Sequence, residues 1–327
     1  MREFEPAEEE AARRRLAVDS VRKALKEEWP QCKLHLYGSG ANGFGLKSND
    51  VDLCMEIDVD SFEIDITPEK EDTDKWLADW ESKQKAQAER ALEMGLDQDA
   101  QENNSTRFSA QRRWMELVEE EKLAIFKVRA LARLVSKQLE SRGMDNVQAL
   151  PHARVPVVKL TVPEANVDCD ICFNNMLAVE NTKLLRDYST IDHRLRQLVL
   201  VVKYWAKQRG VNDAYRGSLS SYCYVLMCIG LLQMRNPPVL PCLQRMEPKT
   251  RRLTILGHDC SYFDKVDQIA GQSRNNESLG ELVVAFFDYW AHRHDFVHDV
   301  FSIRLGHLIS KVWFSLGAAV VLMESTS

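Results

Sequence analysis

The 327-residue sequence lacks the features of a membrane-spanning or secreted protein. The apolar run within residues 312–327 is too short to cross a bilayer. No signal peptide precedes the eight scattered cysteines, and residues 1–15 are charged throughout. We therefore predict a cytosolic protein, with a nuclear location left open, whose thiols are reduced and which has no membrane partner.

Paired cysteine motifs at zinc spacing are also missing. Cys169 and Cys172 form one C-x-x-C pair without a second pair, and on a strand these two side chains would point to opposite faces. No RNA-recognition module and no zinc knuckle is visible, so any RNA would be held by scattered basic side chains. Neither a protein partner nor an oligomeric state can be read from the sequence.

A net positive charge is absent, because the sequence contains 43 basic and 49 acidic residues and therefore has a net charge of −6. Residues 58–102 contain 15 acidic and 5 basic residues, so they alone carry −10 and the rest carries about +4. An acidic total therefore does not exclude a nucleic-acid partner. We interpret residues 58 to about 112 as an acidic insertion, partly helical and partly disordered.

What the sequence does contain is concentrated in residues 34–57, LHLYGSGANGFGLKSNDVDLCMEI. Alternation from Asp50 onward predicts a strand on which Asp50 and Asp52 share a face. Two such carboxylates repel each other unless a cation lies between them, which suggests a site for a hard metal ion. Upstream, Gly38 and Ser39 form a tight turn that could hold a phosphate. Each feature alone is typical of an ordinary turn or solvent-facing strand, whereas their combination is more specific.

Gly38-Ser39 followed by Asp50-Val51-Asp52 resembles the signature of the DNA polymerase β-like nucleotidyltransferases. These enzymes transfer a nucleoside monophosphate using two metal ions held by three carboxylates. The resemblance therefore implies a third carboxylate on a later strand.

The segment Val167 to Asn175, VDCDICFNN, supplies this carboxylate. On a short strand, Asp168, Asp170 and Cys172 share one face. The run from Cys169 to Asn175 is similar to the C-D-I-x-F-N-N run of the terminal uridylyltransferases, which implies that Asp170 is the third metal ligand. Asp168 is the fallback.

Periodicity predicts several further elements. Helices are expected over Arg13–Trp29, Trp114–Leu139, Arg194–Lys207 and Gly217–Leu232, and a strand over Val155–Val162. The helix over Arg194–Lys207 is predicted to point Lys203 and Lys207 to one exposed face. Without the resemblance, these two lysines would be interpreted as solvated helix residues.

By resemblance, a set of residues is expected to contact a nucleoside triphosphate. The phosphates are assigned to the Gly38–Ser39 turn, the two helix lysines and a hydroxyl at a helix N-terminus, the sugar to residues after the third aspartate, and the base to a stacking tyrosine. The residues are Gly38, Ser39, Asn175, Ala178, Asn181, Thr182, Lys203, Lys207, Ser221 and Tyr222. A tyrosine at the mouth of an apolar helix is otherwise more often part of the core.

The resemblance implies an α+β protein with two domains. A polymerase β-like nucleotidyltransferase domain, a mixed sheet flanked by helices, is expected at residues 31–175, interrupted by the acidic insertion. A mainly helical poly(A)-polymerase-associated domain is expected at 1–30 and 176–327. In the family, an acidic loop that influences the choice of base follows the position of Gly306. Residues 312–327 lack this loop, which implies a truncated C-terminus.

Three histidines, His292, His294 and His298, lie in a segment that the family uses for structure. We therefore expect them to be packed or solvated and not to bind a metal.

The function implied by the resemblance is template-independent addition of uridines from UTP to RNA 3′ ends. Asp50, Asp52 and Asp170 would be the catalytic residues and would hold Mg²⁺ or Mn²⁺. Two alternatives remain open, namely a cytoplasmic-type poly(A) polymerase that uses ATP and an inactive scaffold that binds RNA or a protein. The missing C-terminal loop leaves both the base preference and the RNA substrate undecided.

Overall fold

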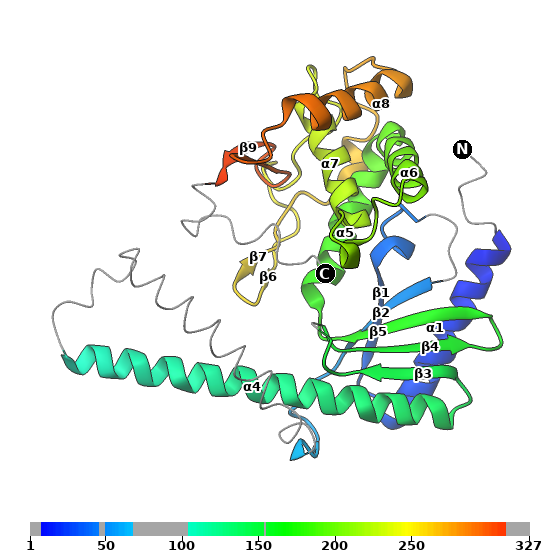
Figure 1. The fold of residues 1–327 in the computed structure, drawn as a ribbon, viewed down its shortest axis with the longest axis vertical. Coiled ribbons are helices and arrows are strands. Elements are labelled where there is room, and N and C mark those ends of the chain that lie inside the picture. Colours follow the sequence, from blue (N-terminus) through cyan, green and yellow to red (C-terminus); the bar gives the residue numbers. More distant parts are fainter. Residues whose placement is uncertain (1–7, 46–49, 68–103, 154, 312–327) are drawn as a thin grey trace.

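The computed structural model describes residues 8–45, 50–67, 104–153 and 155–311. It consists of a five-stranded sheet with two helices on one face and a helical layer on the other (Figure 1). Most of the expected acidic insertion and the C-terminal segment 312–327 lie outside the described residues. In the part of the chain that the structure describes, no helix has both the length and the apolar character needed to cross a membrane.

The sheet has the strand order β1-β2-β5-β4-β3, in which β2 and β5 are parallel and the other neighbours are antiparallel. Its apolar face carries alternate residues of each central strand, such as Val51, Leu53 and Met55 on β2. The strand bounds are β1 (Lys33–Tyr37), β2 (Asp50–Glu56), β3 (Asp145–Leu150), β4 (Val157–Val162) and β5 (Val167–Phe173).

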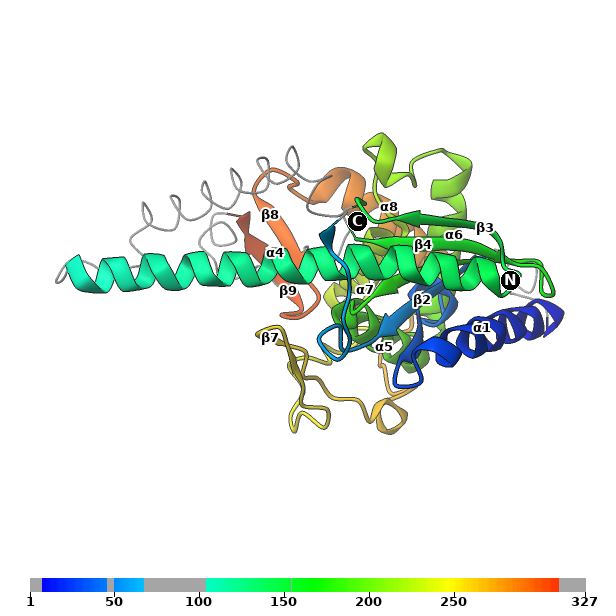
Figure 2. The same cartoon turned by 90° about the horizontal axis from the view of Figure 1, so that it is seen from below.

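Two helices cover the apolar face, α1 (Glu8–Glu28) and α4 (Asn104–Ser141). Helix α4 runs across the sheet and extends well beyond it (Figures 1 and 2). It ends as predicted before Gly143, whose φ of +78° is the left-handed conformation that glycine adopts easily. The predicted first helix is present, but it packs on the sheet and not on the helical layer, because Val21 and Leu25 are fully buried against the strands. This packing differs from the expected assignment of residues 1–30 to the helical domain.

The helical layer covers the opposite face through α5 (Met176–Ile191), followed by α6 (His193–Gln208), α7 (Ser221–Met234) and α8 (Leu279–Asp288). Its own core includes four residues of α6 at helical spacing, Leu195, Leu198, Val199 and Val202, all fully buried. The sequence did not predict the short 3₁₀ helices, the π-helix and the two small hairpins. The 3₁₀ helix η1 (Gly38–Gly40) lies between β1 and β2. Between and after the helices of this layer lie η3 (Ala214–Arg216), η4 (Val266–Gln268), η5 (Tyr289–Arg293), β6 (Thr254–Ile255), β7 (His258–Asp259), β8 (Asp299–Ser302) and β9 (His307–Ser310).

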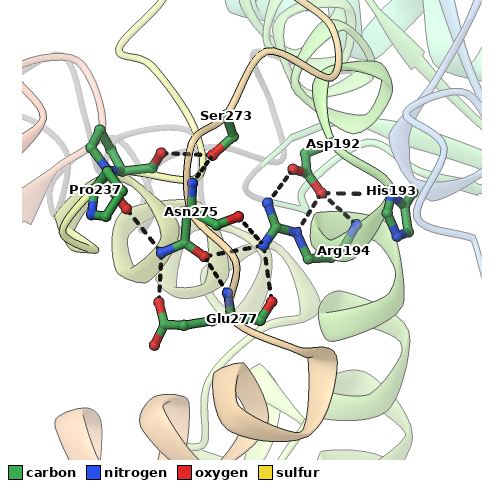
Figure 3. Close-up of polar contacts among 8 residues, drawn as sticks. Asp192, His193, Arg194, Pro237, Ser273, Asn275 and Glu277 are labelled. Carbon is green, nitrogen blue, oxygen red and sulfur yellow. Dashed lines mark hydrogen bonds and ion pairs between the residues drawn. The ribbon is translucent and has the colours of Figure 1, made fainter.

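A buried polar network holds the helical layer together (Figure 3). The Arg194 guanidinium donates to both oxygens of Asp192, to the backbone oxygen and side chain of Asn275, and to the backbone oxygen of Glu277, at 2.7–3.1 Å. The Asn275 amide donates in turn to the Pro237 backbone oxygen at 2.9 Å. The α5–α6 junction is thereby joined to the connector after α7 and to the segment that leads into α8.

The histidines after α8 have structural surroundings. His294 packs edge-on against Trp290 and Phe296, with ring centroids 4.7 and 4.6 Å away. His298 lies on the surface, where its Nδ1 is 2.7 Å from an oxygen of Asp295. These contacts agree with the expected packed or solvated roles.

Candidate active site

Four aspartates lie together on the face of the sheet that is turned away from α1 and α4. Because β2 and β5 are parallel, Asp50 pairs with Asp168 and Asp52 pairs with Asp170 in the strand register. The intervening Val51 and Cys169 are buried on the other face. Both predicted carboxylate-bearing strands are therefore present, and the structure adds that they are neighbours in the sheet.

The two aspartates of β5 have different partners on β4. Lys159 lies in register with Asp170, and its Nζ is 2.5 Å from Asp170 Oδ2. The Thr161 hydroxyl donates to Asp168 Oδ1 at 2.7 Å. The sequence analysis predicted β4 as a strand but did not single out Lys159, because its position opposite Asp170 depends on the antiparallel register of two strands.

Electrostatic repulsion is concentrated at Asp52. The pKa of this carboxyl is raised to about 6, mainly by burial and also by the charges of Asp170 and Asp50, while Lys159 acts in the opposite direction. A divalent cation bound to oxygen ligands would relieve this repulsion, so the donor set fits Mg²⁺ or Mn²⁺. Among the described residues, no three His, Cys, Asp or Glu side chains stand close enough to hold a metal ion together without rearrangement. One visible obstacle is Lys159, which engages the Asp170 carboxylate.

The turn at Gly38 lies directly against Asp52. A Cβ on Gly38 would be 2.3 Å from Asp52 Oδ2, and the φ of Gly38 is +69°, so both space and backbone conformation require glycine here. The Gly38 N–H donates to the Thr182 hydroxyl at 3.0 Å, and this hydroxyl donates to the Ala178 backbone oxygen at 2.9 Å. Helix α5 thus holds the turn beside the carboxylates.

The residues expected to contact the sugar lie at the start of α5. Asn175 is the N-cap of this helix, where its side chain accepts a hydrogen bond from the Ala178 N–H at 3.3 Å. Asn181 and Thr182 follow one turn later. The neighbouring Asn174 exchanges two hydrogen bonds of 2.9 Å with the backbone of Ile57, which joins the ends of β2 and β5. Sequence reasoning did not single out this bridge, although the F-N-N run contains the residue.

The predicted pair of exposed lysines on α6 requires a correction. Lys207 is exposed, but Lys203 is buried, with 5% exposure. Its Nζ donates to the Phe44 backbone oxygen at 2.8 Å. Burial, together with the charge of Lys207, lowers the pKa of Lys203 to about 8. The periodicity placed both lysines on one side of α6 but could not show that the loop before β2 covers one of them.

The start of α7 combines a cap with two of the predicted site residues. Ser220 is the N-cap and accepts from the Cys223 N–H at 3.3 Å. Ser221 forms hydrogen bonds with the Asn212 side chain at 3.0 and 3.2 Å. Tyr222 is partly buried against the helical core. The structure therefore places Ser221 and Tyr222 at a helix N-terminus, as predicted, and α7 packs beside the lysine-bearing α6.

Comparison with known families assigns both parts of the molecule. Residues 1–190 match the family model described as poly(A) RNA polymerase, mitochondrial-like, central palm domain. Residues 278–316 match the model described as Cid1 family poly A polymerase. The second match covers α8 and the β8–β9 hairpin, where the sequence had indicated a poly(A)-polymerase-associated segment.

Curated relatives include enzymes that use different nucleotides. Human terminal uridylyltransferase 7 is 29% identical over 325 residues, which cover 96% of this chain and 18% of that protein. Poly(A) RNA polymerase cid13 of Schizosaccharomyces pombe is 40% identical over 180 residues, which cover 54% of this chain and 31% of that protein. The chain spans less than a third of the length of either relative.

Solved structures agree with these matches. A crystal structure of the Cid1 poly(U) polymerase is 27% identical and superposes with a TM-score of 0.69 over 98% of this chain and 79% of that chain. The chain therefore belongs to the terminal uridylyltransferase and poly(A) polymerase family of polymerase β-like nucleotidyltransferases, as its motifs predicted.

Proposed function

We propose that the protein adds nucleotides, and uridines in particular, to RNA 3′ ends without a template. The proposal depends chiefly on the arrangement of Asp50, Asp52 and Asp170, which lie on two neighbouring parallel strands, with the Gly38 turn packed against Asp52. Solved complexes of Cid1 with a UTP analogue and with the short product ApU support this choice of substrates by similarity.

In this proposal, the three aspartates hold Mg²⁺, or Mn²⁺ in its place. When bound, the metal would promote deprotonation of the RNA 3′-hydroxyl and neutralise charge on the triphosphate. The negative field already present at Asp52 favours the binding of such a cation. Asp170 forms an ion pair with Lys159. We assign it to the metal ligand position nearest the attacking 3′-hydroxyl.

The phosphates are assigned to a set of donors around the carboxylates. Ser39 follows the Gly38 turn, Lys203 and Lys207 lie on α6, and Ser221 lies at the N-terminus of α7, where the helix dipole favours anions. These groups would stabilise the charge that develops on the leaving pyrophosphate. We assign the sugar to Asn175, Ala178, Asn181 and Thr182, and stacking on the base to Tyr222.

The second candidate is transfer of adenosine from ATP by the same carboxylates. It is favoured by the 40% identity to the poly(A) RNA polymerase cid13 over the shared 180 residues. We rank UTP first because the matching solved structures include several of the Cid1 poly(U) polymerase, one of them in complex with a UTP analogue.

The experiment that tests the function is extension of a short unstructured RNA with Mg²⁺, with UTP, ATP, CTP and GTP supplied separately. Extension mainly with UTP would support the proposal, and extension mainly with ATP would move the protein to the second candidate. A folded protein that extends RNA with none of the four nucleotides would contradict both and would favour a scaffold role.

Substitution of Gly38 by alanine is expected to lower kcat by about 10²-fold, because a Cβ at this position would displace the Asp52 carboxylate. Gly40 provides the matched control, since a Cβ there would meet no atom within 4 Å. Steady-state extension kinetics of Gly38→Ala and Gly40→Ala would show the difference. Equal rates in the two variants would mean that the turn does not position Asp52.

Binding of the triphosphate is expected to weaken at alkaline pH. With a pKa of about 8, the Lys203 side chain is a cation below pH 8 and becomes neutral above it. We therefore expect the Kd of a non-hydrolysable UTP analogue to rise by about tenfold between pH 7 and 9.5, as one charge at the phosphates is lost. Calorimetric titration at several pH values would measure this rise.

Lys203→Arg is the control for the pH dependence, because arginine remains charged over the whole range. In this variant the Kd should stay nearly constant between pH 7 and 9.5. A rise equal to that of the unmodified protein would assign the titration to another group.

A further inference from the structure

Phe44 belongs to the loop between η1 and β2, yet its side chain is buried in the core of the helical layer. The side chain is fully buried, and the core to which it belongs includes residues of α5, α6 and α7. Residues 41–45, which include Asn42 and Gly45, form the loop that follows the Gly38 turn. An aromatic side chain of the nucleotidyltransferase sheet unit is thus inserted into the other unit.

The loop backbone is attached to the helical layer at two further points. Lys203 Nζ donates to the Phe44 backbone oxygen at 2.8 Å, and Arg196 Nε donates to the Gly43 backbone oxygen at 3.1 Å. Gly43 approaches α5 so closely that a Cβ would be 2.6 Å from the Ser189 hydroxyl. Two cations of α6 and the end of α5 therefore hold the same two loop residues.

The loop is also folded back on the Gly38–Ser39 turn. The N–H groups of Ala41 and Asn42 donate to the Gly38 backbone oxygen at 3.2 and 3.1 Å. The Asn42 side chain accepts from the Phe44 N–H at 2.9 Å, and a Cβ on Gly45 would be 2.9 Å from the Ser39 backbone oxygen. Because the turn and the attached residues are packed this closely, a displacement of Phe44 must also displace Ser39.

We propose that Phe44 is a positioning residue for the nucleotide phosphates, through the anchor formed by Phe44, Gly43, Arg196 and Lys203. This inference rests on the proposed function, since it assigns the phosphates to Ser39 and Lys203. The Lys203 ammonium has three N–H donors, of which one is engaged by the Phe44 backbone oxygen. The remaining donors can bind phosphate only while the loop holds the ammonium in place, so loop docking and triphosphate binding support each other.

The test compares Phe44→Ala with Phe44→Leu and Phe263→Ala. Phe263 is buried in the same helical core, with 7% exposure, but it belongs to the segment between β7 and η4, so its truncation removes the same atoms from a different part of the chain. We expect Phe44→Ala to raise the KM for UTP by about tenfold with a smaller change in kcat. In Phe44→Leu, the KM for UTP should return most of the way to that of the unmodified protein. The KM of Phe263→Ala should stay within about twofold of the unmodified protein, because this change does not displace Ser39.

Hydrogen exchange provides a readout that does not depend on catalysis. Amide protection of residues 38–45 should fall in Phe44→Ala and persist in Phe263→Ala, whereas a purely structural role would lower protection across the helical core in both variants. Unchanged exchange of residues 38–45 in Phe44→Ala, or an unchanged KM, would overturn the proposal. If the unmodified protein does not extend RNA, the proposed function fails, and the exchange comparison still decides whether Phe44 anchors the turn.

Discussion

Replacement of Asp52 by asparagine is expected to lower the rate of RNA extension by about 10³-fold or more, because the amide keeps the shape but not the charge of a metal ligand. The substitution should not reduce the melting temperature. The pKa of Asp52 is raised to about 6, so at pH 7 the group is still mostly ionised but its charge destabilises the folded protein relative to the unfolded chain, and a neutral amide removes that cost. Single-turnover extension and thermal unfolding would measure the two effects.

Asp168 and Asp170 provide the matched comparison for this prediction. Both lie on the carboxylate face of β5, but Asp168 is held by the Thr161 hydroxyl, whereas Asp170 pairs in register with Asp52. We expect Asp170→Asn to be as inactive as Asp52→Asn, and Asp168→Asn to retain activity within about threefold. The opposite order would transfer the third ligand position to Asp168. Full activity of Asp52→Asn would refute the carboxylate site altogether.

Replacement of Arg194 by methionine is expected to destabilise the protein by about 3–5 kcal/mol, because it leaves the Asp192 carboxylate buried without its cation. The Arg194 and Asp192 side chains are only 12% and 7% exposed, and the guanidinium also holds the backbone of Asn275 and Glu277 (Figure 3). Denaturant unfolding would measure the free energy of unfolding.

Arg216 is the control for the Arg194 prediction, since it pairs with Asp213 but has an 88% exposed side chain. The change Arg216→Met should alter the free energy of unfolding by about 0.5 kcal/mol or less, as is usual for exposed ion pairs. An equal loss of unfolding free energy in both variants would show that the network around Arg194 contributes no more to stability than an exposed ion pair does.

The sequence was informative wherever local periodicity decides the structure. Alternation predicted which residues of β2 and β5 face the carboxylate side, and helical spacing predicted the buried face of α6. Asp50 and Asp52 could be recognised because two acidic side chains on one face of a strand are unfavourable without a cation. The roles of Asp170, Asn175 and Ser221 were implied only by resemblance to a family, and their contacts with nucleotide or metal stay predictions.

Features that depend on pairing between distant segments could not be predicted. Lys159 is one exposed residue of a strand until the β4–β5 register places it beside Asp170. Lys203 was expected at the surface, but it is buried where the Phe44 loop, more than 150 residues earlier in the chain, packs against it. Helical spacing within α6 contains no information about this distant segment. The packing of α1 on the sheet was equally undetermined, since an amphipathic helix shows that it has an apolar face but not which surface covers it.

The contact between Lys159 and Asp170 means that the protein carries an internal counter-ion within the carboxylate cluster that we propose as its catalytic site. A metal ion held by Asp170 would take the place of this ammonium. The folded state consequently does not depend on the metal for charge compensation at Asp170. A chelator is expected to stop nucleotide transfer while the protein stays folded, with a fall in melting temperature of only a few degrees from the loss of the bound ion, in contrast to proteins whose metal is part of the fold.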